Sequence, residues 1–424
     1  MNFFPDKKLL NNSIKHWAKL ISITASAQII VQVLGFVCGI VIIRFLPVKE
    51  YALYILANTM LGAMTVLGNA GIAQGVMAEG GKVWQDKDKL GEVLVTGLDL
   101  RKKFAIASLV LTIPILLYLL LDNDASWMAS ILISVSLIPA FYAGLSDSLL
   151  QIVPKLNHNV KPLQKNQVAV SVGRLVILLS TIFIFPFAAI TILANGVPRI
   201  YGNIKLRAIA QEHANFKQQP NAEIRKNILR VVKRILPESI YYTISGQLVI
   251  WLVSIFGDTA SIAELGALSR ITMLITFVII MIDYILVPRF SKLKNDPSVL
   301  KKEYFTIQII LLFISFFILL GVYVFTDYIL LILGENYFGL NTELFLMAIN
   351  GCILLFSTST NKLLTSRGIV VSPVFYISFM IAIQFSFAFL VDLTTLKGII
   401  IYSILTTIII YLVRVLYFLI QIRK

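Results

Sequence analysis

Long apolar segments recur along the whole chain, and they constrain its fold more than any other feature. Each is about 20 residues or longer, the length that a helix needs to cross a hydrocarbon layer of about 30 Å. In lipid the backbone must satisfy its own hydrogen bonds, so each segment predicts an α-helix. The twelve segments are residues 19–46, 51–78, 103–121, 127–153, 167–185, 187–205, 235–256, 262–287, 304–325, 342–364, 370–391 and 398–421.

The composition supports an all-α integral membrane protein. The chain is 58% hydrophobic and only 14% charged, whereas soluble domains are about 45–50% apolar and about 25% charged. Only Phe185-Pro186-Phe187 separates the fifth segment from the sixth. This tripeptide fits either a tight turn at the membrane interface or a kink within one long helix, and the sequence leaves both open.

Basic residues predict the topology of these helices. With a cytoplasmic N-terminus, 30 of the 37 lysines and arginines fall in inner segments, and only Arg44, Lys49 and Lys397 fall in outer ones. Such a bias follows the positive-inside rule and places both termini in the cytoplasm. It also accounts for the net charge of +15, so a nucleic-acid partner is not needed.

The longest inner segment predicts the domain boundaries. It covers residues 206–234 and separates an N-terminal six-helix bundle, residues 1–205, from a C-terminal one, residues 235–424. Its end, NILRVVKRIL, has basic and apolar residues at helical spacing. This pattern predicts an interfacial helix lying on anionic headgroups; the alternative is an ordinary helix end that obeys the inside rule.

Three arginines and two aspartates lie deep within the predicted spans: Arg174, Arg199, Arg270, Asp147 and Asp283. Ionisable groups at this depth generally face a bundle interior or a water-filled cavity. Arg270 and Asp283 are about 20 Å apart along their helix and about 140° apart around it, so they cannot pair directly.

Arg199 follows Asn195, Gly196 and Pro198, a sequence that suggests a broken helix whose backbone faces a cavity. Because a guanidinium group stays charged and binds phosphate through a planar fork, the three arginines favour an anionic cargo. The alternative is structural pairing with Asp147, Asp283 or carbonyl groups. The two aspartates are candidates for balancing the charge or coupling to an ion.

The sequence contains no HExxH, GxSxG or P-loop motif, and its outer loops are short, so we expect no enzyme and no cofactor. Cys38 and Cys352 lie in apolar segments, and the three histidines are far apart. A disulfide framework and a metal site are therefore not expected.

Two stretches carry a resemblance to a known family. The first is IIRFLPVKEYALYILANTMLGAMTVLGNAGI, residues 42–72, and the second runs from LGALSRI to VPRFSKL, residues 265–293. They resemble motifs of the polysaccharide-exporter branch of the multidrug/oligosaccharidyl-lipid/polysaccharide exporter superfamily. The matching residues are Arg44, Leu46, Pro47, Glu50, Tyr51, Leu67, Gly68, Gly266, Arg270, Pro288, Arg289 and Ser291. The turn glycine of the first motif is missing, and Ala52 replaces a second glycine.

This resemblance implies two six-helix bundles around a central cavity in the bacterial inner membrane. The implied function is a flippase for undecaprenyl-diphosphate-linked oligosaccharide units of O-antigen or capsule, with Arg270, Arg174 and Arg199 contacting the headgroup. Its implied partners are membrane lipids, the lipid-linked substrate and other polysaccharide-assembly membrane proteins. Two alternatives remain: a cation-coupled multidrug exporter of the same superfamily, and a membrane-bound polysaccharide polymerase or acyltransferase.

Overall fold

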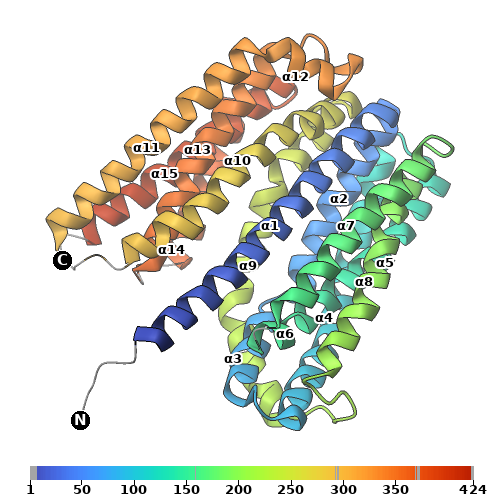
Figure 1. Ribbon diagram of the computed structural model, residues 1–424. Helices are drawn as coiled ribbons and strands as arrows, with labels where there is room; N and C mark the ends of the chain where they lie inside the picture. Colours follow the sequence, from blue (N-terminus) through green and yellow to red (C-terminus); the bar gives the residue numbers. More distant parts are fainter. Residues whose placement is uncertain are drawn as a thin grey trace. The chain divides into compact units, whose positions relative to one another are not determined.

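The computed structural model describes residues 7–157, 159–291, 293, 296–367, 369 and 373–421. Within these ranges some side chains, including those of residues 7–23 and Asp283, fall outside the described set. Helices form all the regular structure of the described residues, which contain no strand (Figure 1). The all-α prediction is confirmed.

Twelve of the described helices have 18 residues or more. They are α1 Lys7–Phe45, α2 Val48–Asn69, α4 Lys87–Asp122, α5 Trp127–Leu150, α7 Val160–Ile182, α8 Ala188–Gln211, α9 Ala222–Phe256, α10 Thr259–Ser291, α11 Pro297–Val324, α13 Asn341–Ser366, α14 Pro373–Leu390 and α15 Leu396–Gln421. Short elements join them: α3 Ile72–Val83, α6 Ile152–Leu156, α12 Thr326–Leu333 and the 3-10 turn Glu335–Tyr337.

Nine membrane spans can be identified among the described residues by length and hydropathy. The three long helices outside this group are α7, α8 and α10. Helices α7 and α8 are less apolar than the nine because each contains arginine and several asparagine or glutamine residues. These two helices therefore combine the length of a span with a polar face.

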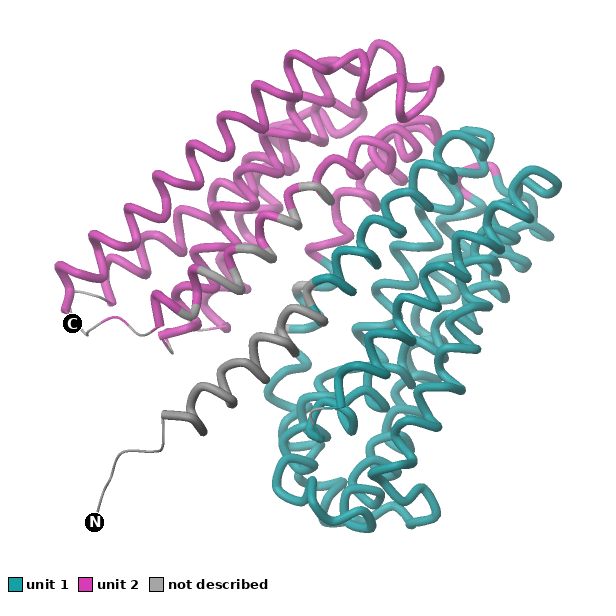
Figure 2. Tube along the Cα trace, viewed as in Figure 1, with its two compact units in different colours: residues 1–121, 125–244 teal, residues 122–124, 245–424 magenta. Residues whose placement is uncertain are grey.

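The chain forms two compact units (Figure 2). Unit 1 comprises residues 1–121 and 125–244, and unit 2 comprises residues 122–124 and 245–424. Helix α9 contributes its first part to unit 1 and its last part to unit 2. The domain boundaries inferred from hydropathy, at residues 205 and 235, stay a prediction.

A turn separates α7 from α8, so the alternative of one kinked helix is wrong. Helix α7 ends at Ile182 and α8 begins at Ala188, after the Phe-Pro-Phe sequence. Glu50, in the first turn of α2, accepts a hydrogen bond from the backbone N–H of Ala188 at 2.7 Å. A carboxylate there satisfies a free N–H group and complements the positive end of the helix.

Helix α8 is continuous, which corrects the expected break beside Arg199. Pro198 lies inside the helix and is buried. Its ring faces Gly173 of α7, where an added Cβ would be 3.3 Å from the proline Cβ. The physical reason for the difference is the small size of Gly173, which leaves room for the proline ring between α7 and α8. The helix therefore does not have to break at Pro198.

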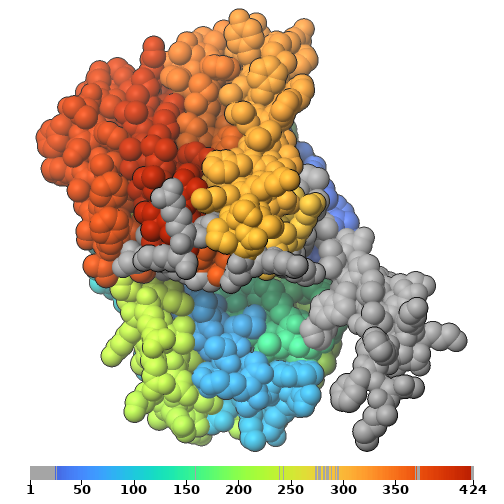
Figure 3. Space-filling view, turned by 90° about the vertical axis from the view of Figure 1, so that its left-hand side faces the viewer, coloured from blue at the N-terminus to red at the C-terminus, as the bar shows by residue number. Residues whose placement is uncertain are grey.

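The basic segment before the seventh span also differs from the predicted interfacial helix. It is the first part of α9, which runs without interruption through Pro237 into the span. Ile228 and Val232 are buried in a core that they share with Leu90 and Leu94 of α4. Figure 3 shows the start of α9, yellow-green, beside the light-blue segment of α3 and α4 within unit 1. Its apolar side therefore contacts protein rather than headgroups.

Aspartates outside the spans begin three of the long helices. Asp86 accepts from the N–H groups of Asp88 and Lys89 before α4, and Asp258 accepts from Ser261 before α10. Asp296 caps α11 through the N–H and the hydroxyl of Ser298. The hydrogen bond from the N–H of Lys89 lowers the pKa of Asp86, and hydrogen bonds from the Ser261 and Ser298 side chains lower the pKa values of Asp258 and Asp296.

Gly202 is expected to be necessary for the close contact between α7 and α8. A Cβ at this position would collide with Cγ2 of Val170. We expect Gly202→Leu to overpack the contact by about 1–3 kcal/mol and to lower the thermal midpoint of the purified protein. Gly35→Leu is the matched control, because a Cβ at Gly35 meets no atom within 4 Å. Equal midpoints for the two variants would contradict this account.

Candidate functional site

A pocket of about 520 Å³ lies inside unit 1, with walls from α1, α2, α5, α7 and α8. This volume is within the range of about 300–1,000 Å³ that is typical of ligand sites. Most of its polar lining consists of amides and charged groups: Gln28, Asn58, Asp147, Gln151, Asn166, Gln167, Arg174, Asn195 and Arg199. The pocket therefore contains three of the five ionisable residues that the sequence analysis identified.

Arg174 is held through an amide of the neighbouring helix. Its Nε and Nη2 atoms donate to Oδ1 of Asn195 at 3.2 and 3.0 Å. Because the arginine uses the amide oxygen, the amide nitrogen of Asn195 donates to Tyr54 Oη at 3.3 Å and to the carbonyl of Thr191 at 3.0 Å. A single asparagine thus connects α7, α8 and α2 beside the pocket.

Arg199 pairs with the one carboxylate of the pocket. Its Nε lies 3.7 Å from Oδ2 of Asp147, while Asn203 donates to the other carboxylate oxygen at 2.7 Å. The Arg199 side chain remains 48% exposed. Gly144 on α5 gives the guanidinium room, since a Cβ there would be 3.4 Å from its Cζ. The pair joins α5 to α8 and leaves part of the Arg199 side chain accessible.

The pocket has an excess of positive charge. Among its described lining residues are two guanidinium groups, those of Arg174 and Arg199, and one carboxylate, that of Asp147. The amide groups that complete the lining carry no net charge. Such an arrangement attracts an anion, because an anion offsets the excess positive charge and accepts hydrogen bonds from both forks.

Amides on α1 and α7 form a further part of the lining. Gln28 donates to Gln164 at 3.2 Å and to Gln167 at 2.7 Å, and Asn166 donates to the carbonyl of Gly202 at 2.9 Å. Amide groups both donate and accept hydrogen bonds, so they suit neutral hydroxyl-rich ligands. These amides were not predicted from the sequence.

Helical spacing is the signal that identifies this lining. On α8, Asn195 and Arg199 line the pocket at an interval of four residues. On α7, Gln167 and Arg174 are separated by seven residues. Residues at these intervals share one face of a helix. Helical spacing therefore identifies the polar lining that α7 and α8 contribute, but not that of α1, α2 and α5.

The other two candidate residues belong to α10. Arg270 is half-buried in unit 2, whereas the side chain of Asp283 lies outside the described residues. The structure thus brings Arg174, Arg199 and Asp147 together in one pocket, and it places Arg270 and Asp283 on another helix. The substrate-binding role of the arginines and the charge-balancing role of the aspartates stay predictions.

Two further arginines are buried between helices. Arg101, counted in the sequence as an inner-segment charge, is only 3% exposed and donates to the carbonyl of Leu145, to Ser148 Oγ and to Asn69 Oδ1. Arg414 of α15 donates to the carbonyl and the hydroxyl of Ser357 on α13 at 3.0 and 2.8 Å. Both guanidinium groups connect helices within one unit rather than face solvent.

The described residues contain no group of three histidine, cysteine or acidic side chains arranged to hold a metal ion. Cys38 and Cys352 are both buried free thiols. Burial among apolar neighbours is the usual environment of an unreactive cysteine.

No protein-family model matches the chain, and no curated protein matches it. Solved structures do. An inward-facing multidrug resistance MATE family transporter of the MOP superfamily aligns with a TM-score of 0.72 and 15% identity, over 92% of this chain and 94% of that one. An outward-facing structure of such a transporter gives 0.63 and 15%, over 95% and 93%.

A third match is MATE in its bent conformation, with a TM-score of 0.60, 14% identity and 95% of each chain covered. At such identities the likeness shows the fold alone. The chain thus has the two-bundle fold of these transporters and, with its apolar helices, is a multi-pass membrane protein. These structural neighbours are transporters and not enzymes.

Asn195 is expected to stabilise unit 1 through its bonds to Arg174 and Tyr54. Asn195→Leu leaves a guanidinium without its acceptor, and we expect the thermal midpoint to fall by about 4 °C or more. Asn58→Leu is the control, since Asn58 lines the same pocket but donates to the carbonyl of Tyr54 on its own helix. A larger loss for Asn58→Leu would contradict the assigned role of Asn195.

Proposed function

We propose that this protein is a flippase that moves undecaprenyl-diphosphate-linked oligosaccharide units from the cytoplasmic to the outer leaflet of the bacterial inner membrane. Such units are the precursors of O-antigen or capsule. The proposal joins the transporter fold to the resemblance of residues 42–72 and 265–293 to polysaccharide exporters. It also implies contact with the other membrane proteins that assemble the polysaccharide.

The observation that carries the proposal is the charge and chemistry of the pocket in unit 1. Arg174 and Arg199 exceed the single carboxylate of Asp147, and amides supply much of the remaining polar lining. A diphosphate needs the first feature, and sugar hydroxyl groups need the second. One pocket therefore offers complementary groups to both parts of a lipid-linked sugar headgroup.

In this mechanism the arginines bind the diphosphate while the polyprenyl tail stays in the bilayer. Asp147 holds Arg199 in place before the headgroup arrives, and Asn195 does the same for Arg174. Alternating opening of the two bundles then moves the headgroup across the membrane. Moving the charges across the membrane potential involves about 2.3 kcal/mol per charge per 100 mV, so the potential or an ion gradient enters the energetics.

A cation-coupled multidrug exporter is the second candidate. The structural neighbours named as multidrug resistance transporters favour it, as does the presence of Asp147 inside the pocket. A cationic drug, however, would meet two guanidinium groups there, and the one carboxylate already has Arg199 and Asn203 as partners. The charge of the pocket therefore favours an anionic cargo.

Transport by the purified protein in proteoliposomes tests the proposal. We expect the wild type to expose a lipid-linked oligosaccharide to an externally added glycosidase. The double variant Arg174→Ala, Arg199→Ala should reduce the rate at least about tenfold, because two charge-assisted contacts are lost. Arg174→Lys should retain part of the activity, and Arg230→Ala, an exposed residue at the start of α9, is the control.

Two results would reject the proposal. Wild-type rates in the double arginine variant would show that the pocket does not bind the headgroup. Efflux of a cationic dye that requires Asp147, without any flipping of the lipid-linked sugar, would establish the multidrug alternative. Arg270→Ala, assayed in parallel, tests the predicted contribution of unit 2.

A further inference from the structure

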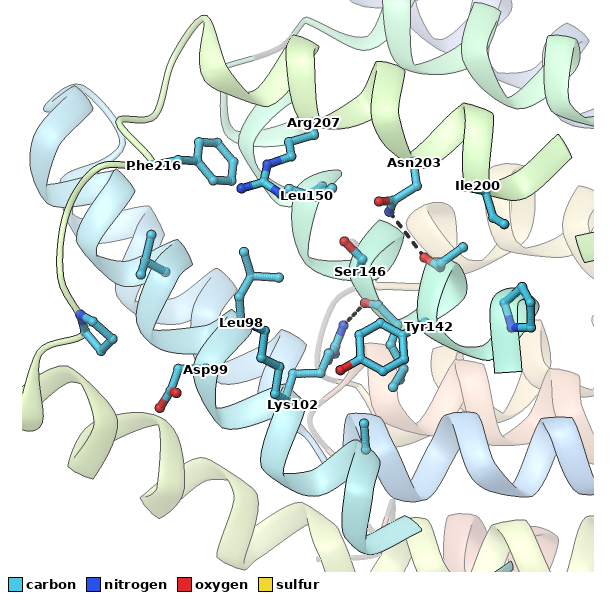
Figure 4. Close-up of a pocket in the computed structure, with 17 residues that line it drawn as sticks. Leu98, Asp99, Lys102, Tyr142, Ser146, Leu150, Ile200, Asn203, Arg207 and Phe216 are labelled. Atoms are coloured by element: carbon cyan, nitrogen blue, oxygen red, sulfur yellow. Dashed lines mark hydrogen bonds between the residues drawn. The ribbon is translucent and has the colours of Figure 1, made fainter. Parts of the chain in front are cut away.

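A second pocket of unit 1, of about 620 Å³, lies between α4, α5, α8 and the loop that follows α8 (Figure 4). It shares no lining residue with the first pocket. Its polar groups include Lys102, Tyr142, Asn203 and Arg207, and the rest of its lining is largely apolar. The proposed function assigns nothing to this pocket.

Two basic side chains give the pocket a positive charge. Lys102 of α4 and Arg207 of α8 are both exposed, and Figure 4 shows them on opposite sides of the pocket. Arg207 is positioned over the ring of Phe216 at 5.3 Å, a cation–π contact. Within the described part of the chain, neither Lys102 nor Arg207 has an ion pair.

The one carboxylate in the lining already has partners. Asp99 accepts a hydrogen bond from Arg225 at 2.6 Å and lies 3.5 Å from Lys103. Arg101 also lines the pocket, but its guanidinium donates to groups of α2 and α5. Lys102 and Arg207 are therefore the groups with which the pocket can bind an anion.

Apolar stripes continue from both basic residues. On α4, Lys102 is followed at intervals of four by Ile106 and Val110, which are 60% and 68% exposed. On α8, Arg207 is preceded at helical spacing by the exposed residues Ile204, Ile200 and Val197. Helix α5 adds a third exposed apolar stripe of Val135, Ile138 and Tyr142. Helices α4 and α8 thus each present a basic residue followed by an exposed apolar stripe. This arrangement is complementary to a lipid with an anionic headgroup and apolar chains.

We propose that this pocket binds an anionic glycerophospholipid from the membrane leaflet that lies next to Lys102 and Arg207. Its phosphate lies between Lys102 and Arg207, and its acyl chains lie along the apolar stripes of α4, α5 and α8. The two basic side chains favour an anionic headgroup, and the apolar stripes favour a lipid over a soluble anion. This inference does not rest on the proposed function, since it concerns a separate pocket.

Binding of phosphatidylglycerol to the full-length protein tests the proposal. The protein is reconstituted in phosphatidylcholine nanodiscs, and a fluorescent phosphatidylglycerol is titrated in. We expect saturable binding that the double variant Lys102→Ala, Arg207→Ala weakens about tenfold or more. Lys205→Ala is the matched control, because Lys205 is also basic and exposed on α8 but lies over the Tyr201 ring and outside the pocket.

Four outcomes would overturn the inference. The first is wild-type affinity in the double variant, and the second is equal binding of phosphatidylcholine. The third is full competition by inorganic phosphate, which would show a site for a free anion. The fourth is binding of a polyprenyl diphosphate without phosphatidylglycerol, which would make the pocket a substrate site. Should the double variant unfold, the single variants Lys102→Gln and Arg207→Gln give the same comparison.

Discussion

The free-energy cost of placing a charged side chain away from water determines how the polar groups of this protein are arranged. A guanidinium group at membrane depth needs acceptors from the protein itself. Arg414 finds them in a carbonyl and a hydroxyl group, and Arg101 uses a carbonyl, a hydroxyl and an amide oxygen. Arg174 uses an amide oxygen and Arg199 a carboxylate. Each arginine therefore also holds helices together. The first pocket differs because Arg174 and Arg199 keep accessible surface there.

Small residues make these contacts geometrically feasible. Gly144 leaves space for the guanidinium of Arg199, Gly173 accommodates Pro198, and Gly202 permits close contact with Val170. In membranes the attraction between helices comes largely from such close packing, because lipid removes the hydrophobic driving force. The position of the charged groups on α8 thus depends on glycines that carry no chemistry of their own.

Hydropathy predicted the helices well, because the bilayer imposes one length and one backbone solution on every span. The same reasoning identified Arg174, Arg199 and Asp147, whose charge is conspicuous in an apolar segment. It did not identify which amides accompany them, because amide residues occur in many of the predicted spans of this chain. The side of the helix on which each one lies depends on its neighbours at helical spacing. Arg101 was missed for a related reason: α4 begins at Lys87, well before its apolar part. Arg101 lies inside the helix but before the predicted span at residue 103, so the sequence assigns it to a loop.

Tertiary contacts decided the remaining differences. In the sequence Pro198 predicts a helix break, but in the structure Gly173 leaves room for its ring. Ile228 belongs to the segment predicted to lie on headgroups, but it is buried in a core with residues of α4. Neither neighbour is close in sequence. Patterns within one helix therefore predicted depth and charge, but they did not predict which surface of a helix meets protein.

One wall separates the two pockets of unit 1, and hydrogen bonds cross it. Asn203 lines the second pocket and donates to Asp147 in the first, while Arg101 lines the second and donates to Ser148 in the first. A ligand that draws Asn203 away leaves the aspartate with one donor fewer and changes its hold on Arg199. Thermodynamic linkage makes such an effect reciprocal. If a ligand of one pocket moves Asn203, the affinity of the other pocket changes with it.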